Sequence, residues 1–257
     1  MTVEVLFDEV CNLNADGRNS EYLQMSMPDA EFIHTKLDDE PYFVRHNPDI
    51  IMMGHMTEKT QRFVIDKLMN LKRRLNELID NGTIFVITGN ALDVFCEHIS
   101  YVTEKIEKDA LGIFPLRAKC DLFDRYNGKQ LSNFAGTCLS STDSDIQSIS
   151  EKSLSADDIK IVGFKSQFSF LYGDNSSFYF SKCVRGVGIN RDSSFEGVRK
   201  NNFFGTHLCG PLLVLNPLFT EYIMHLAGHN GSAAFRDAAM DAYRQHVKEF
   251  EDPKTQF

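Results

Sequence analysis

Two continuous apolar runs on either side of one long amphipathic segment constrain the fold of this chain most. The runs are residues 49–54 and Thr83–Ile87. Residues 57–81 lie between them and carry apolar side chains at helical spacing, with Thr57 as the expected N-cap. Continuous apolar strands that alternate with helices are typical of a parallel sheet covered on both faces. The sequence therefore predicts an α/β fold with a mainly parallel sheet flanked by helices.

Other segments extend this pattern and add a β-rich second half. Residues 116–190 are rich in alternating and aromatic stretches, which favour antiparallel strands, and a polar loop is expected at residues 140–158. The β-rich part is interpreted as an insertion on the sheet, so residues 1–257 are expected to form a single domain that ends in an amphipathic helix at about 233–250. Further strands are predicted at Val3–Phe7, Glu31–Leu37, Ile159–Phe164, Gln167–Tyr172, Ser177–Phe180 and Asn202–Leu208, and further helices at Ala91–His98 and Pro217–Leu226.

Composition narrows the classes of function. The chain has 257 residues and a net charge of −9, so its surface repels phosphate backbones and nucleic-acid binding is disfavoured. No apolar run approaches the ~18 residues of a membrane span, and the N-terminus lacks the basic region of a signal peptide. Six cysteines without CxxC spacing favour reduced thiols. We therefore expect a cytoplasmic protein that binds neither nucleic acid nor membranes.

Several segments resemble the motifs of one enzyme family in the family's order. Residues 12–23 resemble N-L-Y-G-D-R-G-N-x-x-Y-L with one Gly-Arg transposition, and residues 49–54 resemble D-x-V-x-I-G. Residues 186–190 resemble a G-x-G-N-N region, and residues 202–217 resemble the late motif G-T-Y-L-H-G-P-L-L-x-x-N-P. Over about residues 1–226 the chain thus resembles the class I glutamine amidotransferases of the cobyric acid synthase (CobB/CobQ) type. The resemblance implies a flavodoxin-like class I amidotransferase fold.

The same resemblance places substitutions at the family's catalytic positions. The family's I-C-G-G contains the nucleophilic cysteine, and here that position is Thr88; the histidine base before Gly-Pro is Cys209. The glycine-rich oxyanion loop reads Gly54-His55-Met56, and Gly89 follows the nucleophile position. A threonine hydroxyl is far less acidic than a thiol, and a thiol does not replace imidazole near neutral pH. The resemblance therefore implies a retained fold without glutaminase activity, and no cofactor.

Three alternatives remain open for these residues. Cys209 as a nucleophile with His207 as its base, two residues away on one strand face, would give an active amidotransferase or hydrolase at the same cleft. The second interpretation is structural. Cys209 would be a buried thiol on a strand, His207 a structural histidine beside it, and Thr88 the cap of the next helix. Cys209, His207, Cys183 and His55 would be the ligands of a metal site, but no second closely spaced pair exists, so no metal is expected.

A polar loop after the first strand supplies candidate ligand-binding residues. Asp16, Arg18 and Asn19 follow that strand at the edge where α/β sheets bind ligands, or they cap the next helix. The helix expected after Thr88 would turn its N-terminus towards a cleft between Thr88, Cys209 and His55, which favours a carboxylate. That carboxylate would belong to a small metabolite or to an acidic side chain of a partner.

The resemblance also implies a class of partner. Within the family it is greatest to glutaminase subunits of the lipid II isoglutaminyl synthase type, which pair with a Mur-ligase-like subunit. A Mur-ligase-like or other synthetase subunit is therefore the expected partner. A subunit of an amidotransferase that takes its nitrogen from ammonia is a further interpretation.

Overall fold

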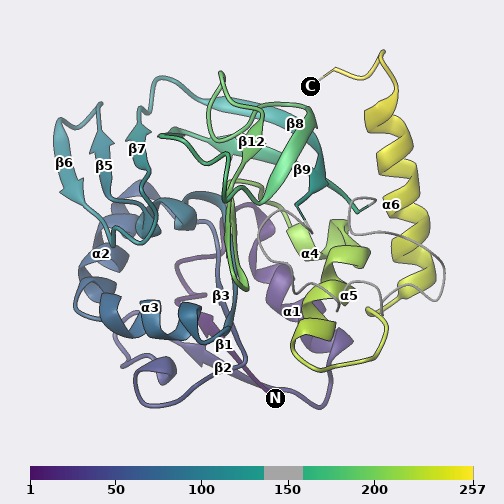
Figure 1. The fold of residues 1–257 in the computed structure, drawn as a ribbon, viewed down its shortest axis with the longest axis horizontal. Helices are drawn as coiled ribbons and strands as arrows, with labels where there is room; N and C mark the ends of the chain where they lie inside the picture. Colours follow the sequence, from purple (N-terminus) through teal and green to yellow (C-terminus); the bar gives the residue numbers. More distant parts are fainter. Residues whose placement is uncertain (136–158, 257) are drawn as a thin grey trace.

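The central sheet is mainly parallel, as predicted. The computed structural model describes residues 1–135 and 159–256. Six strands lie in the order β13-β14-β4-β3-β1-β2, and only the β13–β14 pair is antiparallel (Figure 1). These strands are β1 (Thr2–Leu6), β2 (Glu31–Thr35), β3 (Ile50–Met53), β4 (Ile84–Thr88), β13 (Val198–Lys200) and β14 (Phe203–Thr206). Thr88 therefore lies at the carboxyl end of a central strand.

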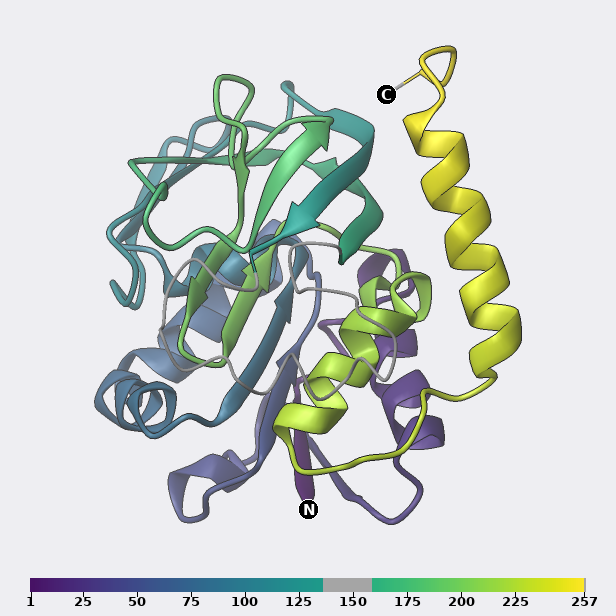
Figure 2. The same cartoon turned by 45° about the vertical axis from the view of Figure 1, so that its right-hand side comes forward.

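Helices cover both faces of this sheet, because alternate residues of its strands enter two separate cores. In β4, Phe85 and Ile87 belong to one core, and Ile84 and Val86 belong to the other. Figures 1 and 2 show the resulting arrangement, with the sheet between two groups of helices. One core includes α2 (Glu58–Met69) and α3 (Lys72–Asp80), and the other includes α1 (Gly17–Ser26), α4 (Leu212–Leu215) and α5 (Pro217–Leu226).

The helix predicted over residues 57–81 is divided into two helices. Thr57 is the N-cap as predicted, and its hydroxyl oxygen accepts a hydrogen bond from the Thr60 amide at 3.1 Å. The first helix ends at Met69, and Leu71 leaves helical geometry with φ −99° and ψ 0° before α3 begins. Both helices bury apolar residues against the same core, so the apolar spacing carried no sign of the break.

The α-helix predicted at Ala91–His98 is wrong. Residues Gly89–Phe95 form a short 3-10 helix (η3), and His98–Tyr101 is strand β5. Every residue of η3 is buried, so its apolar run reflects burial on all sides rather than one helix face. A short 3-10 helix lacks the aligned dipoles of a long α-helix, so the expected positive helix terminus beside Thr88 is absent from this described segment.

The second half contains two four-stranded sheets, in the orders β10-β7-β5-β6 and β12-β11-β8-β9. Apart from the parallel β5–β7 pair, their strands pair antiparallel, as predicted. The predicted strand at Ser177–Phe180 is wrong, because these residues form turns, and residues 140–158 lie outside the described residues. The strands are β5, β6 (Ile106–Asp109), β7 (Arg117–Cys120), β8 (Tyr126–Phe134), β9 (Lys160–Gln167), β10 (Ser169–Tyr172), β11 (Ser181–Arg185) and β12 (Phe195–Glu196).

The remaining elements are a C-terminal helix and two short 3-10 turns. Helix α6 (Arg236–Glu251) agrees with the predicted amphipathic helix and packs on β8 and β9 (Figure 2). The turns are η1 (Leu13–Ala15) and η2 (Tyr42–Val44). Among the described residues, no helix is both long enough and apolar enough to cross a membrane. The cysteines at positions 11, 96, 120, 183 and 209 are free thiols, and Cys138 lies outside the described residues.

Candidate functional site

Thr88 does not adopt the backbone geometry of a nucleophile elbow. An elbow holds its nucleophile on a strained turn between a strand and a helix. Thr88 instead has extended geometry, with φ −122° and ψ 153°, and the positive φ of 61° belongs to Gly89. A Cβ atom on Gly89 would lie 2.6 Å from Cβ of His55, so only glycine fits there. The turn is therefore built for close packing against His55.

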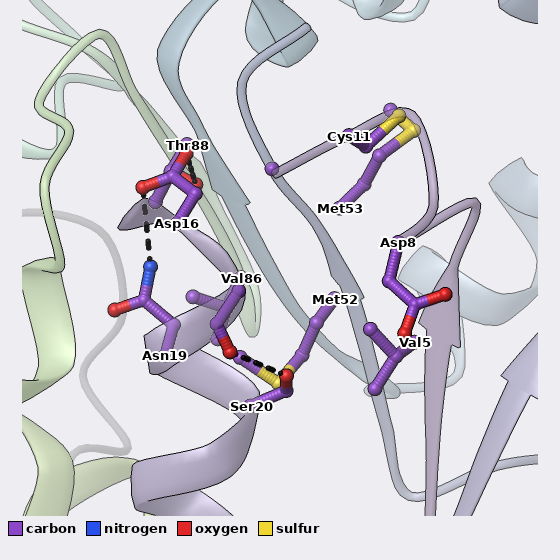
Figure 3. A pocket seen from close by; sticks show the side chains of 12 residues that line it. Val5, Asp8, Cys11, Asp16, Asn19, Ser20, Met52, Met53, Val86 and Thr88 are labelled. Atoms are coloured by element: carbon purple, nitrogen blue, oxygen red, sulfur yellow. Dashed lines mark hydrogen bonds between the residues drawn. The ribbon is translucent and has the colours of Figure 1, made fainter. Parts of the chain in front are cut away.

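A buried carboxylate is the centre of the candidate site. The Oδ2 atom of Asp16 accepts hydrogen bonds from the His55 amide at 2.7 Å and from the Thr88 hydroxyl at 2.8 Å. Its Oδ1 atom accepts a longer one from Asn19 Nδ2 at 3.3 Å (Figure 3) and another from the Gly210 amide at 3.4 Å. We call these five residues the Asp16 cluster. The prediction that Thr88 caps the next helix is wrong, because its hydroxyl donates to Asp16 and makes no cap.

Burial dominates the electrostatics of Asp16. It raises the pKa of the carboxyl to about 6, although the hydrogen bonds from His55, Thr88, Gly210 and Asn19 act in the opposite direction. The side chain is only 4% exposed. Asp16 precedes α1, but its side chain makes no capping hydrogen bond, so its donors come from elsewhere in the fold. The carboxylate is thus held inside the protein by groups that are distant in sequence.

His55 contributes its amide to the Asp16 cluster and its ring to a neighbouring contact. Its Nδ1 atom accepts a hydrogen bond from Asn14 Nδ2 at 3.0 Å. Burial, reinforced by the nearby His207, lowers the pKa of the His55 imidazole to about 4, so the ring is neutral at pH 7. The preceding Gly54 is also obligatory, because a Cβ atom there would lie 2.5 Å from the Cys11 carbonyl oxygen and 2.9 Å from Cβ of Asp16.

Three backbone amides at the oxyanion-loop positions, those of His55, Met56 and Gly89, are engaged within the chain. The His55 amide donates to Asp16, and the Met56 amide donates to Asn90 Oδ1 at 3.0 Å. The Gly89 amide donates to the Leu208 carbonyl at 3.2 Å. An oxyanion hole needs amides that point at the place where negative charge develops. Here these amides already have partners.

A small cavity lies beside the Asp16 cluster (Figure 3). Its free volume is about 20 Å³, which suits roughly one water molecule and is too small for a glutamine side chain. Thr88, Asp16, Asn19 and Gly54 line it, together with apolar residues from β1, β3 and β4. Neither His207 nor Cys209 belongs to the lining, so the cavity does not connect Thr88 with either of these residues.

His207 lies in a separate group of buried polar residues. Its Nε2 atom is 2.7 Å from Oδ1 of Asp93, and both side chains are fully buried. The Oδ2 atom of Asp93 accepts hydrogen bonds from Ser169 Oγ at 2.5 Å and from Gln61 Nε2 at 3.4 Å. We call these four residues the Asp93 cluster. Because Asp93 accepts from both His207 and Ser169, the histidine is not placed between a nucleophile and a carboxylate as a general base would be.

Cys209 points elsewhere, so the expectation that it shares one strand face with His207 is wrong. Strand β14 ends at Thr206, and both residues follow it. The Cys209 thiol donates to the Phe164 carbonyl at 3.5 Å, and its amide donates to the same oxygen at 3.0 Å. Burial, with a smaller contribution from the nearby Asp16, raises the pKa of this thiol to about 12. A thiol with such a pKa remains protonated near neutral pH and is a poor nucleophile.

An ion pair in the core lies beside the Asp93 cluster. Lys165 Nζ contacts Glu196, with both side chains fully buried, and donates to the carbonyls of Val187 at 2.9 Å and Gly188 at 2.6 Å. Glu196 Oε1 accepts from the His207 amide at 2.9 Å, which connects the pair to the Asp93 cluster. Lys165 and Glu196 therefore form a structural ion pair within the core.

The structure separates the residues that the sequence grouped together. Thr88, Gly54, His55, Asp16 and Asn19 meet in one place, whereas Arg18 does not, because its exposed side chain pairs with Glu21 on the surface of α1. The four proposed metal ligands do not converge: among residues 1–135 and 159–256, no group of three or more His, Cys, Asp or Glu side chains has the arrangement of a metal site.

Sequence reasoning missed Asp93. The signal was its position as the one charged residue in the otherwise apolar or small segment 89–95, since a carboxylate within such a segment needs buried partners.

Comparisons with known proteins support a relationship to glutamine amidotransferase-like proteins. No family model matches the chain. It is 23% identical over 194 residues to "Lipid II isoglutaminyl synthase (glutamine-hydrolyzing) subunit GatD" of Staphylococcus aureus (strain N315), covering 75% of this chain and 69% of the relative. Its fold is similar to the structure of PurLQS from Thermotoga maritima, with a TM-score of 0.52, 12% identity, and coverage of 96% of this chain and 98% of the other. The chain is thus amidotransferase-like in sequence and α/β in fold.

Proposed function

We propose that this protein is a class I glutamine amidotransferase-like subunit, folded as one flavodoxin-like domain, that lacks glutaminase activity and acts by binding a partner. The engagement of the oxyanion-loop amides carries this proposal. His55, Met56 and Gly89 each donate their amide hydrogen within the chain, the first of them to a carboxylate. A developing oxyanion would have to displace Asp16 and would meet its negative charge.

The groups at the nucleophile and base positions support the same conclusion. The Thr88 hydroxyl donates to Asp16, and no imidazole accepts its proton. The Cys209 thiol is buried, donates to a backbone carbonyl and has its pKa raised to about 12. The adjacent cavity of about 20 Å³ does not admit the side chain of the substrate. Each of these features alone removes a step of thiolate-based amide hydrolysis.

The partner is inferred from the relative. The similar Staphylococcus aureus protein is named as a subunit of a synthase. A fold that is retained without hydrolytic chemistry is explained if its surface still binds a synthetase subunit. The expected subunit is a Mur-ligase-like protein. Gel filtration of the tagged chain from its native host tests this point. A synthetase-type subunit should co-elute in a fixed ratio, and elution of the chain alone would contradict it.

Ammonia release from L-glutamine tests the catalytic part of the proposal. Purified protein should release none above the buffer blank, both alone and with the co-purified subunit. Loss of a nucleophile or base costs factors of about 10⁴–10⁶ in related chemistry, so residual turnover should be undetectable. Steady turnover that disappears in Cys209→Ala or His207→Ala would support the alternative enzyme instead.

A restored variant sharpens this assay. The double substitution Thr88→Cys with Cys209→His returns the family's nucleophile and base, yet we expect it to remain inactive. The reason is that the amides of His55 and Gly89 keep their internal partners. Recovery of turnover in this variant would show that the oxyanion-loop amides are available, and that the substitutions alone silence the protein.

A further inference from the structure

The donors around Asp16 form a complete carboxylate-binding arrangement. Two short hydrogen bonds reach one oxygen, from a backbone amide and a hydroxyl, and two longer ones reach the other. The donors come from α1, the loop after β3, the end of β4 and the segment after β14. Four separate segments thus converge on one carboxylate group, which is how proteins recognise an anionic ligand.

The loop that carries this carboxylate is strained. Asn14 and Ala15 both have positive φ values, 56° and 64°, immediately before Asp16. Asparagine tolerates this region, but alanine does so at a cost of roughly 1 kcal/mol. The loop is also pressed against Gly54, where any side chain would collide with Asp16. The fold therefore accepts local strain in order to place the Asp16 side chain among these donors.

We propose that the Asp16 cluster is a monocarboxylate-binding site whose resident ligand is the Asp16 side chain, and that formate takes its place when that side chain is removed. The proposal rests on the same engaged His55 amide as the proposed function, but its test measures binding and not ammonia release. The two therefore fail independently. Formate has the same heavy atoms as the carboxylate that Asp16→Ala removes, whereas acetate carries an additional carbon where alanine keeps its Cβ atom.

Formate-dependent unfolding tests the proposal. Asp16→Ala is unfolded with urea at constant ionic strength while chloride is exchanged for formate. Its equilibrium constant for unfolding should fall in proportion to 1/(1 + c/Kd), where c is the formate concentration, that is by roughly tenfold once formate reaches ten times its dissociation constant. Three controls should show no such dependence. They are the wild-type protein, Asp16→Asn, in which a carboxamide occupies the place of the carboxylate, and Asp8→Ala, which removes another carboxylate that lines the cavity. Equal responses of Asp16→Ala and wild type to formate would overturn the proposal.

A refolding experiment covers the case in which Asp16→Ala does not fold alone. The variant is diluted from urea into formate, acetate or chloride, and the fraction that recovers native circular dichroism is measured. Formate should raise this fraction above that in chloride, and acetate and the bulkier pivalate should not, because their carbon substituents would collide with the Cβ atom that alanine keeps. If no carboxylate raises it, the donors do not act as a site for a free carboxylate, and the proposal is wrong.

Discussion

The two polar clusters near the end of β4 surround their carboxylates with different kinds of groups. In the Asp93 cluster, Asp93 and His207 are fully buried and face each other directly, with Ser169 and Gln61 completing the contacts. In the Asp16 cluster, the carboxylate is held by backbone amides, a hydroxyl and a carboxamide, and no basic side chain among the described residues bonds to it. The first cluster lies in the packed core, and the second borders a small cavity.

This difference gives the two groups of residues different roles. His207 belongs to the packed core, where it contacts Asp93 and lies beside the Lys165–Glu196 pair. The Thr88 hydroxyl and the amides of His55 and Gly210 surround an anion, and that anion is a carboxylate of the same chain. The Asp93 cluster should therefore govern stability, whereas the Asp16 cluster should govern ligand response and pH dependence.

Removal of Asp93 should have the largest effect. Asp93→Ala leaves the His207 ring and the Ser169 hydroxyl without their acceptor in a buried region, whereas the Gln61 amide keeps its shorter bond to the Asn90 carbonyl. We expect the free energy of unfolding in urea to fall by about 3–5 kcal/mol, the usual cost of removing one partner of a buried pair.

The matched variant in the other cluster is Thr88→Val, which removes one hydrogen bond to Asp16 and keeps the side-chain shape. It should cost about 1.5–3 kcal/mol, the usual contribution of a hydrogen bond to a charged group. If Thr88→Val destabilises the protein more than Asp93→Ala, the assignment of stability to the Asp93 cluster is wrong.

Two substitutions should change the pH dependence of stability in opposite directions. The pKa of Asp16 is raised to about 6, so its contribution to stability is complete below its unfolded pKa near 4 and is lost as pH rises through 6. The pKa of His55 is lowered to about 4, so its contribution is present above pH 6.5 and is lost as pH falls through 4. In the wild type the two effects offset each other between pH 4 and 6.5.

Each single substitution should therefore reveal the pH dependence of stability that the remaining residue contributes. Between pH 6.5 and 4, Asp16→Asn should lose about 2–3 kcal/mol more of its unfolding free energy than wild type, and His55→Gln should lose that much less. Urea titrations at several pH values measure both. Parallel curves for all three proteins would show that neither group titrates with a shifted pKa.

Relief of strain before Asp16 should give a smaller effect of the opposite sign. Ala15 has a φ of 64°, so Ala15→Gly should stabilise the protein by about 0.5–1 kcal/mol in thermal unfolding. The control is Ala238→Gly on the exposed side of α6, which should destabilise by about the same amount. Destabilisation by both variants would mean that the loop is unstrained.

The sequence predicts the sheet well because burial there has a direct signature. The strands at Ile50–Met53 and Ile84–Thr88, the cap at Thr57 and the helix at Pro217–Leu226 follow from local apolar patterns and capping chemistry. The same logic failed at residues 91–98. A short segment that is buried on every side shows no periodicity, so its apolar residues resemble those of a buried helix.

The candidate site is only partly predictable because its contacts join distant segments. Asp16, Asn19 and Thr88 were singled out from the sequence, but the hydrogen bond between Asp16 and Thr88 spans 72 positions. Local sequence does not indicate whether an acidic side chain near a sheet edge awaits a ligand or fills the place itself. The contact of His207 with Asp93 likewise joins residues that are 114 positions apart, so local sequence does not pair them.

Labelling with an electrophilic glutamine analogue, a diazoketone that alkylates active-site nucleophiles of glutaminases, tests the loss of catalysis most directly. The protein is incubated with the analogue and mapped by peptide mass spectrometry, with denatured protein as the control for intrinsic thiol reactivity. We expect no adduct on Thr88 or Cys209 in the folded protein, because Thr88 donates to Asp16 and the Cys209 thiol is buried and protonated. A stoichiometric adduct on either residue, prevented by glutamine, would contradict this account.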